Sequence, residues 1–299
     1  MPDPVVPSTR KHRAGAPTHS GELLRQAATG HAQQYQSRGE HIMRLTDVGW
    51  VWEGQGLDPG VNPSIFGIGD GCEYFGLSRA NYMFHPNDDL ALGKLRGLGE
   101  VTCDISKWKW KDSANGGSEQ YVDAAPASVL AEARLVSEIS TKYPNITGGF
   151  HDDMLGLVKR EATTPEQYAG IYGALKSVNP GLRMWTVLYT HELEDDLWKG
   201  FQQHMDVVCL WVWEAANLPG LEGYIARCRE LLGGKPLIMG AYLRDYPTKA
   251  PVPMDLLKLQ WDIILRGLEQ GTLDGFSILS ANLIDGHQQQ AEYIRDLIA

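Results

Sequence analysis

Eight short, β-rich apolar runs separated by stretches with helical spacing constrain the fold of this chain most. The runs span residues 47–52, 64–68, 100–105, 146–151, 183–189, 206–213, 236–242 and 275–280. Several are almost continuously apolar, which is typical of parallel strands covered on both faces. Six of the seven intervals between the runs hold a helical pattern, and the exception is a loop around residues 58–63.

Helix start signals fall inside these intervals. Asn87 or Asp88 caps one expected helix, and Pro126 opens another. Residues 164–167 (Thr-Pro-Glu-Gln) combine an N-cap, a proline at the first helical position and a capping-box glutamine. Further helices are expected over residues 221–232, 253–268 and 288–298.

The alternation of strands and helices predicts a (β/α)8 TIM-like barrel over residues 41–299. Residues 1–40 are rich in Pro, Gly, Ser, His and Gln and are expected to form a flexible N-terminal extension. A doubly wound open sheet is the alternative. Such sheets carry a glycine-rich turn that opens a helix. Residues 67–71 (Gly-Ile-Gly-Asp-Gly) have an acid in the turn and no helical pattern directly behind it, which disfavours a phosphate site.

Composition excludes several classes of protein. A formal charge of -10 argues against nucleic-acid binding, and the basic cluster at residues 10–13 is expected to be a solvated part of the tail. The four cysteines lack CxxC spacing, so neither a zinc site nor a disulfide framework is expected. No segment reaches the roughly 18 apolar residues of a membrane helix. The first thirty residues lack the apolar region of a signal peptide, so we expect a cytoplasmic protein without a membrane partner. Its oligomeric state stays open.

Polar and aromatic residues gather where the apolar runs end. Active sites of β/α barrels lie at the carboxyl ends of the strands, so these residues are the candidates for ligand binding. The candidate substrate-binding residues are Asp104, Trp108, His151, His191, Trp211, Trp213, Tyr242, Arg244, Asp245 and Asn282.

Two consecutive acids, Asp152 and Asp153, end the fourth run. Adjacent residues of a strand point to opposite sides, but at a turn both side chains can reach the mouth of a barrel. Two close carboxylates do not both ionise cheaply, so one gains a raised pKa and can act as a general acid. The alternative is a helix N-cap followed by an acidic first turn.

Glu214 is the third candidate catalytic residue. It follows the apolar run at residues 206–213, and a carboxylate beside tryptophan is expected to be desolvated. Acids from the fourth and sixth strands could flank a glycosidic bond. The alternative is a structural glutamate paired with Arg244 or a lysine.

Tryptophans indicate the class of ligand. Six of them lie at or near ends of the predicted strands: Trp50, Trp52, Trp108, Trp110, Trp211 and Trp213. The apolar faces of sugar rings stack on flat aromatic rings, whereas the alternative is that half or more of these residues are core. Lysines alternate with Trp108 and Trp110, which favours these two as ligand platforms.

Two resemblances follow from these residues. Residues 150–154 (Phe-His-Asp-Asp-Met) resemble the paired-aspartate strand end of O-GlcNAcase-type glycoside hydrolases. That resemblance implies that one aspartate orients an acetamido group and the other is the general acid/base. Residues 104–108, 143–153 and 240–246 resemble a bacterial family of uncharacterised barrel proteins, which implies the fold and the place of the site.

The sequence therefore predicts a glycoside hydrolase-like enzyme that acts on a carbohydrate without a cofactor. Asp153 is the expected general acid, and Glu214 or Asp152 is the second carboxylate. One alternative is a metal-dependent sugar isomerase, epimerase or lyase, with ligands among Asp104, His151, Asp153, His191 and Glu214. The other is a non-catalytic carbohydrate-binding barrel.

Overall fold

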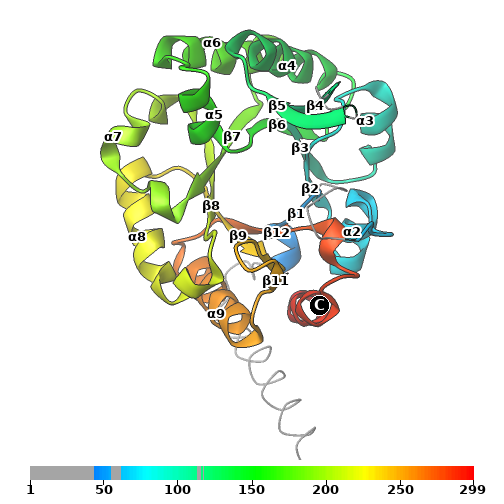
Figure 1. The fold of residues 1–299 in the computed structure, drawn as a ribbon, viewed down its shortest axis with the longest axis vertical. Coiled ribbons are helices and arrows are strands. Elements are labelled where there is room, and N and C mark those ends of the chain that lie inside the picture. The colour runs from blue at the N-terminus through cyan, green and yellow to red at the C-terminus, as the bar shows by residue number, and fades with distance from the viewer. Residues whose placement is uncertain (1–43, 55–61, 113–115, 117) are drawn as a thin grey trace, which may run out of the picture. The chain divides into compact units, whose positions relative to one another are not determined.

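The computed structural model describes residues 44–54, 62–112, 116 and 118–299, and these form the predicted barrel (Figure 1). Eight parallel strands close into a ring in the order β1-β12-β9-β8-β7-β6-β3-β2. Their bounds are β1 (Gly49–Trp52), β2 (Arg79–Tyr82), β3 (Glu100–Asp104), β6 (Ile146–His151), β7 (Arg183–Tyr189), β8 (Val207–Trp211), β9 (Leu237–Tyr242) and β12 (Gly275–Leu279). The predicted N-terminal extension, residues 1–40, lies outside the described residues.

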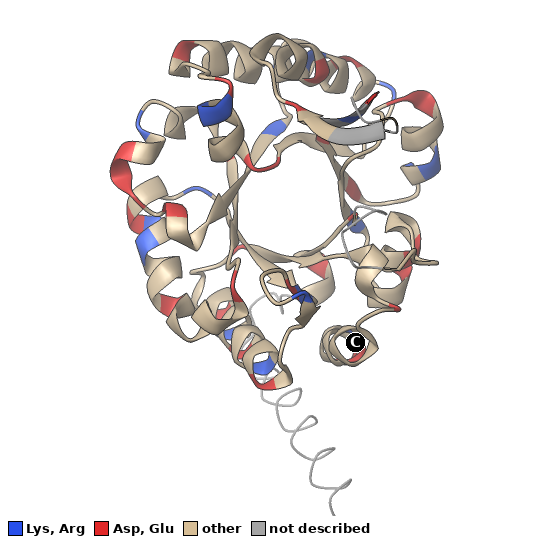
Figure 2. Cartoon of the chain, viewed as in Figure 1, with Lys and Arg blue, Asp and Glu red and all other residues tan. Residues whose placement is uncertain are grey.

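Helices surround the strands, and charged residues lie mainly on this outer layer (Figure 2). The helices are α2 (Ile68–Phe75), α3 (Asp89–Leu95), α4 (Pro126–Ile139), α5 (Met154–Arg160), α6 (Pro165–Leu175), α7 (Asp195–Trp198), α8 (Leu221–Leu232), α9 (Met254–Gln270) and α10 (Gln288–Ile298). Two hairpins follow barrel strands: β4 (Lys107–Asp112) with β5 (Ser118–Asp123), and β10 (Arg244–Asp245) with β11 (Ala250–Pro251). In the described part of the chain, every helix is too short or too polar to cross a membrane.

The helix starts predicted from capping residues are confirmed. Thr164 accepts a hydrogen bond from the amide of Gln167 at 3.2 Å, and the Gln167 side chain accepts one from the Thr164 amide at 2.9 Å. Asp88 caps α3 by accepting from the amide of Ala91 at 2.9 Å. These bonds satisfy amides that a helix leaves open in its first turn, so the boundaries follow from local sequence.

The prediction of a strand over residues 64–68 is wrong, because α2 begins at Ile68 and the second barrel strand is β2. The amide of Gly67 donates to Asp70 at 2.8 Å, so the glycine-rich turn is capped by its own acid. β2 has a polar interior residue, since Asn81 is fully buried and donates to Thr102 at 2.8 Å. A strand with such a residue lacks the apolar run by which the others are recognised.

Alternation along the strands decides which side chains enter the barrel. On β6, Phe150 points inward and meets Trp52 with ring centroids 4.7 Å apart. Trp52 also meets Trp211 of β8 edge-on at 5.4 Å, so aromatic rings fill the barrel below its mouth. His151 points outward toward α6, and the next residue, Asp152, points inward again at the strand end.

Candidate active site

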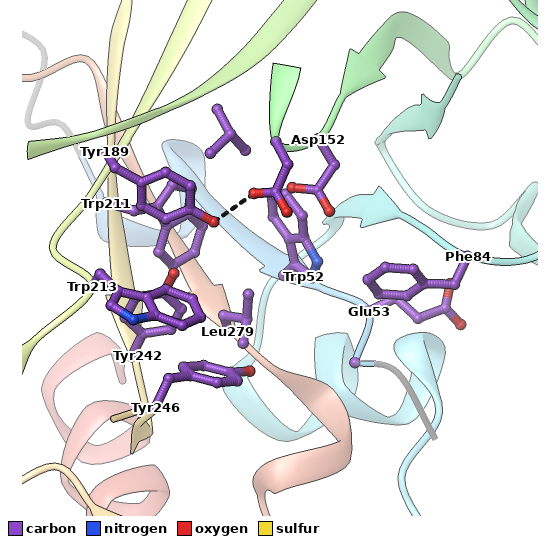
Figure 3. Close-up of a pocket in the computed structure, with 13 residues that line it drawn as sticks. Trp52, Glu53, Phe84, Asp152, Tyr189, Trp211, Trp213, Tyr242, Tyr246 and Leu279 are labelled. Atoms are coloured by element: carbon purple, nitrogen blue, oxygen red, sulfur yellow. Dashed lines mark hydrogen bonds between the residues drawn. The ribbon is translucent and has the colours of Figure 1, made fainter. Parts of the chain in front are cut away.

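A cavity of about 120 Å³ opens at the carboxyl ends of the strands (Figure 3). Its carboxyl groups are those of Glu53 after β1 and of Asp152 and Asp153 after β6. Its walls are mostly aromatic and come from five of the strand ends and their loops: Trp52, Phe84, Tyr189, Trp211, Trp213, Tyr242 and Tyr246. The cavity thus joins acids and flat rings at the end of the barrel where β/α enzymes act.

Asp152 is the carboxyl group with the stronger tendency to hold a proton. Burial raises the pKa of Asp152 well above its ordinary value, and the charges of Asp153 and Asp104 raise it further. Among the described residues, no Lys, Arg or His forms an ion pair with Asp152 or Asp153. A carboxyl group in such surroundings stays protonated at a higher pH than usual and can donate a proton to a leaving group.

Asp153 is held by a tyrosine and not by a helix. It occupies the N-cap position of α5, but its side chain caps no helix amide. Its Oδ1 instead accepts a hydrogen bond from the hydroxyl of Tyr189 at 2.7 Å, as Figure 3 shows. Burial raises the pKa of Asp153, and the bond from Tyr189 opposes that rise. The alternative of an N-cap therefore describes the backbone of Asp153 but not the role of its carboxylate.

The backbone at Asp153 allows both acids to reach the cavity. Its φ of 47° lies in the left-handed region, which non-glycine residues adopt rarely and at an energetic cost. This turn directly after β6 redirects the chain, so Asp153 does not alternate to the outside as a continued strand would require. Asp152 and Asp153 consequently line the same space.

Aromatic residues from β7, β8 and β9 form the wall opposite Phe84 (Figure 3). Trp213 stacks on Tyr246 with ring centroids 5.0 Å apart and planes 21° apart, and 38% of Trp213 stays exposed. Trp211 lies deeper, 1% exposed, against Tyr242 at 4.6 Å. Trp213 therefore offers a ring face near the opening, whereas Trp211 is part of the cavity floor.

Glu53 is a cavity residue that the sequence reasoning missed. It directly follows β1, is 8% exposed, and accepts from the amide of Met83 at 3.2 Å. The His85 Nε2 atom lies 3.5 Å from its Oε1. The signal was available, because Glu53 directly follows the first apolar run as Asp152 follows the fourth. Phe84, Tyr189 and Tyr246 were likewise not among the candidate site residues.

Glu214 lies outside the cavity, contrary to the predicted pairing with the acids of the fourth strand. It is exposed and precedes a 3-10 helix at residues 215–220. Trp213 uses the inward position of this segment, so its successor faces away. The acids at the ends of the fourth and sixth strands are therefore not brought together.

His151 also lies away from the cavity. Its ring is 2% exposed and stacks on Tyr168 of α6, with its Nδ1 3.2 Å from the Tyr168 hydroxyl. Burial lowers the pKa of His151 to about 3, so the imidazole is neutral at physiological pH. Its outward position on β6 explains why it does not reach a ligand in the barrel.

The remaining candidates divide by location. Asp104 is fully buried beside the cavity and accepts from the amide and hydroxyl of Ser106 at 2.8 and 3.0 Å. Asp245 is 7% exposed and accepts from the amide of Ala215 at 2.9 Å, so it ties two loops together. Trp211, Trp213 and Tyr242 line the cavity, whereas Arg244, Asn282 and His191 do not. Trp108 lies on β4, and its side chain is outside the described residues.

Across the described residues, no three His, Cys, Asp or Glu side chains are arranged to hold a metal ion. The ligands considered for a metal-dependent enzyme are dispersed, since His151 faces α6 and Glu214 faces outward. His191 is exposed and stacks on Tyr189 at 5.3 Å. The described residues therefore do not bring together the ligands expected for a metal-dependent enzyme.

Several solved glycosidase structures share the barrel. No protein-family model matches the chain, and no curated protein matches it in sequence. A β-glucuronidase of Bacteroides uniformis is 14% identical with a TM-score of 0.52, over 80% of this chain and 30% of that one. An active-site mutant of the Rhizomucor miehei β-1,3-glucanosyltransferase, in complex with laminaritriose, is 14% identical with a TM-score of 0.51. The match covers 78% of this chain and 87% of that one.

A chitinase of Chromobacterium violaceum is 9% identical with a TM-score of 0.51, over 84% of this chain and 99% of that one. This chain thus spans less than a third of the glucuronidase but nearly all of the chitinase. Since these identities are low, the similarity shows a common barrel and no common activity.

Proposed function

We propose that this protein is a glycoside hydrolase-like enzyme in which Asp152 and Asp153 perform the acid–base chemistry. The observation that carries the proposal is the pair itself. Two adjacent carboxyl groups share one aromatic-lined cavity, and no described basic side chain forms an ion pair with either of them. The fold similarity to glycosidases is consistent with this function.

Asp152 is the general acid in this proposal, which reverses the role expected from the sequence. Three effects raise its pKa, and burial is the largest. Asp153 is the ionised partner because the Tyr189 hydroxyl donates to its carboxylate and stabilises the charge. Since the two groups interact, the pair titrates as a unit, with one proton shared at neutral pH.

The aromatic wall holds the sugar in this proposal. Trp213 presents the exposed face on which a sugar ring stacks, and Tyr242 and Tyr246 close the same side of the cavity. A ring stacked there lies opposite the aspartates, as the arrangement in Figure 3 illustrates. Positioning of this kind brings the glycosidic oxygen to the proton donor and supplies part of the rate acceleration.

Turnover of a panel of aryl glycosides by the wild type, Asp152→Asn and Asp153→Asn tests the proposal. Loss of a general acid lowers kcat by about 10²–10⁴-fold, and both variants are expected to keep the wild-type circular dichroism spectrum. Asp153→Asn removes a charge that raises the pKa of Asp152, so the alkaline limb of its residual activity moves to lower pH. Wild-type activity in Asp152→Asn would refute the assignment, and binding without turnover across the panel would favour a carbohydrate-binding barrel.

A further inference from the structure

The cavity has an excess of negative groups over positive ones. Glu53, Asp152 and Asp153 line it, and its described lining includes no Lys, Arg or His. Arg244 comes near, with its Cζ 5.9 Å from the centre of the Tyr246 ring. It is 2% exposed and lines a separate small cavity instead of the main one. A positive group entering the main cavity therefore gains favourable electrostatic energy there.

The aromatic wall is suited to the same kind of group. Trp213 meets Tyr189 at 5.8 Å with planes 89° apart and Tyr242 at 6.3 Å with planes 87° apart. In these contacts the positive edge of one ring meets the negative face of the other, and Trp213, which is 38% exposed, keeps part of its ring open to the cavity. Ammonium groups bind over exposed aromatic ring faces by cation–π attraction.

The indole N–H of Trp52 is an independent sign of a polar ligand. Trp52 is 2% exposed and lines the cavity. Its nitrogen donates to none of the described residues, and Figure 3 shows it on the side of Asp152 and Phe84. The nitrogen is accessible from the cavity, so this N–H can donate to an oxygen of the ligand. The cavity thus offers one donor for a hydroxyl and several acceptors for a cation.

We infer that the ring bound in this cavity carries an ammonium group, so that the substrate class is glycosides of amino sugars with a free amine. The inference rests on the proposed function for its sugar chemistry. Asp153 is the main partner of the ammonium, because His85 already lies 3.5 Å from Glu53. A uronic acid would place a carboxylate against the ionised groups of Glu53 and Asp153, and an N-acetylated sugar carries no charge to balance them.

Calorimetric binding to the full chain and to its Asp152→Asn variant tests the inference. The probes are trisaccharides of glucosamine, N-acetylglucosamine, glucose and galacturonate, at a pH where the amine is protonated. The glucosamine trisaccharide is expected to bind at least ten-fold more tightly than the two neutral ones, and the galacturonate trisaccharide most weakly. Added salt should reduce that preference, because it screens partly exposed charges. Equal or tighter binding of any other probe, or no binding of the glucosamine probe, overturns the inference.

Charge variants locate the effect. Asp153→Asn is expected to remove the preference for the glucosamine trisaccharide, and Glu53→Gln to reduce it about three-fold. Glu214→Gln is the matched control, because this exposed glutamate follows Trp213 but does not line the cavity, and it should leave the preference unchanged. If Glu214→Gln and Asp153→Asn lost the preference for the glucosamine trisaccharide to the same extent, only the overall charge of the protein would matter. That result would refute an ammonium site in the cavity.

The outcomes separate this inference from the proposed hydrolysis. Selective binding of the glucosamine trisaccharide without cleavage keeps the ammonium site and refutes the hydrolase. Cleavage of neutral or acetylated glycosides without preference for the free amine keeps the hydrolase and refutes the ammonium site.

Discussion

Replacing Tyr189 by phenylalanine separates the two aspartates by their response to pH. The hydroxyl of Tyr189 donates to Asp153 at 2.7 Å, and this bond stabilises the ionised carboxylate. A hydrogen bond to a charged group contributes about 1.5–3 kcal/mol, and the lower end applies here because Asp153 is accessible from the cavity. Since one pH unit corresponds to about 1.4 kcal/mol, the loss amounts to roughly one unit.

The sign of the expected shift follows from the proposed roles. Asp153 acts while ionised, so the acid limb of the pH–rate profile reports its protonation. Without the hydroxyl the charged form is less stable, and the limb moves up by about one pH unit. The assay is kcat/KM against pH with the best aryl glycoside of the panel.

A matched variant controls for the loss of a tyrosine–carboxylate bond as such. Tyr172 donates to Asp206 at 2.8 Å, just before β8 begins and thus at the end of the strand away from the cavity. Tyr172→Phe should leave the profile unchanged. An unchanged acid limb in Tyr189→Phe, or an equal shift in Tyr172→Phe, would refute the assignment of Asp153 as the ionised partner.

Four further substitutions test the packing of the barrel, the aromatic wall and the burial of His151. Gly240→Ala would place a Cβ 2.1 Å from Cδ2 of Trp211, so we expect the free energy of unfolding to fall by about 1–3 kcal/mol and binding to be impaired. Gly173→Ala in α6 has open space around it and should raise the free energy of unfolding by about 0.5–1 kcal/mol. Urea unfolding measures both changes. Trp213→Ala removes a ring that is 38% exposed, so KM should rise about ten-fold while the unfolding midpoint changes little. Because burial lowers the pKa of His151 from 6.5 to about 3, the unfolded state alone takes up this proton as the pH falls below 6.5. The wild type should therefore lose about 3 kcal/mol more stability than His151→Gln between neutral pH and pH about 4.5.

Local signals explain why most of the barrel was predictable. The capping box at Thr164 needs only residues within one turn, and buried strands such as β7 are long apolar runs, so both are visible in the sequence. β2 was missed because its interior residue Asn81 is satisfied by Ser277, which is 196 positions away and donates to it at 2.7 Å. A polar residue of this kind becomes a credible strand residue only once its distant partner is known.

The site was predictable where it depended on the end of a strand and not where it depended on the following turn. Asp152 was found because it directly follows the apolar run of β6, and the same strand-end rule would have found Glu53, which directly follows β1. The direction of Glu214 depends on the 3-10 turn after Trp213, which the apolar pattern does not encode. His151 was misplaced because its outward position follows from the register of β6, which was not fixed when the strand was identified.

Under the proposed function, the left-handed backbone at Asp153 opposes activity to stability. At a φ of 47° a glycine is unstrained, whereas an L-residue with a side chain is destabilised there by roughly 1 kcal/mol. Asp153→Gly should accordingly unfold at a higher urea concentration than Asp153→Ala while both are inactive, and equal midpoints would contradict the strain. The glycine variant also leaves an anion-sized gap beside Tyr189, in which added formate should restore part of the activity. In the proposed function, the carboxylate of Asp153 thus occupies a position where glycine would be the more stable residue, so the chemistry is gained at the expense of folding stability.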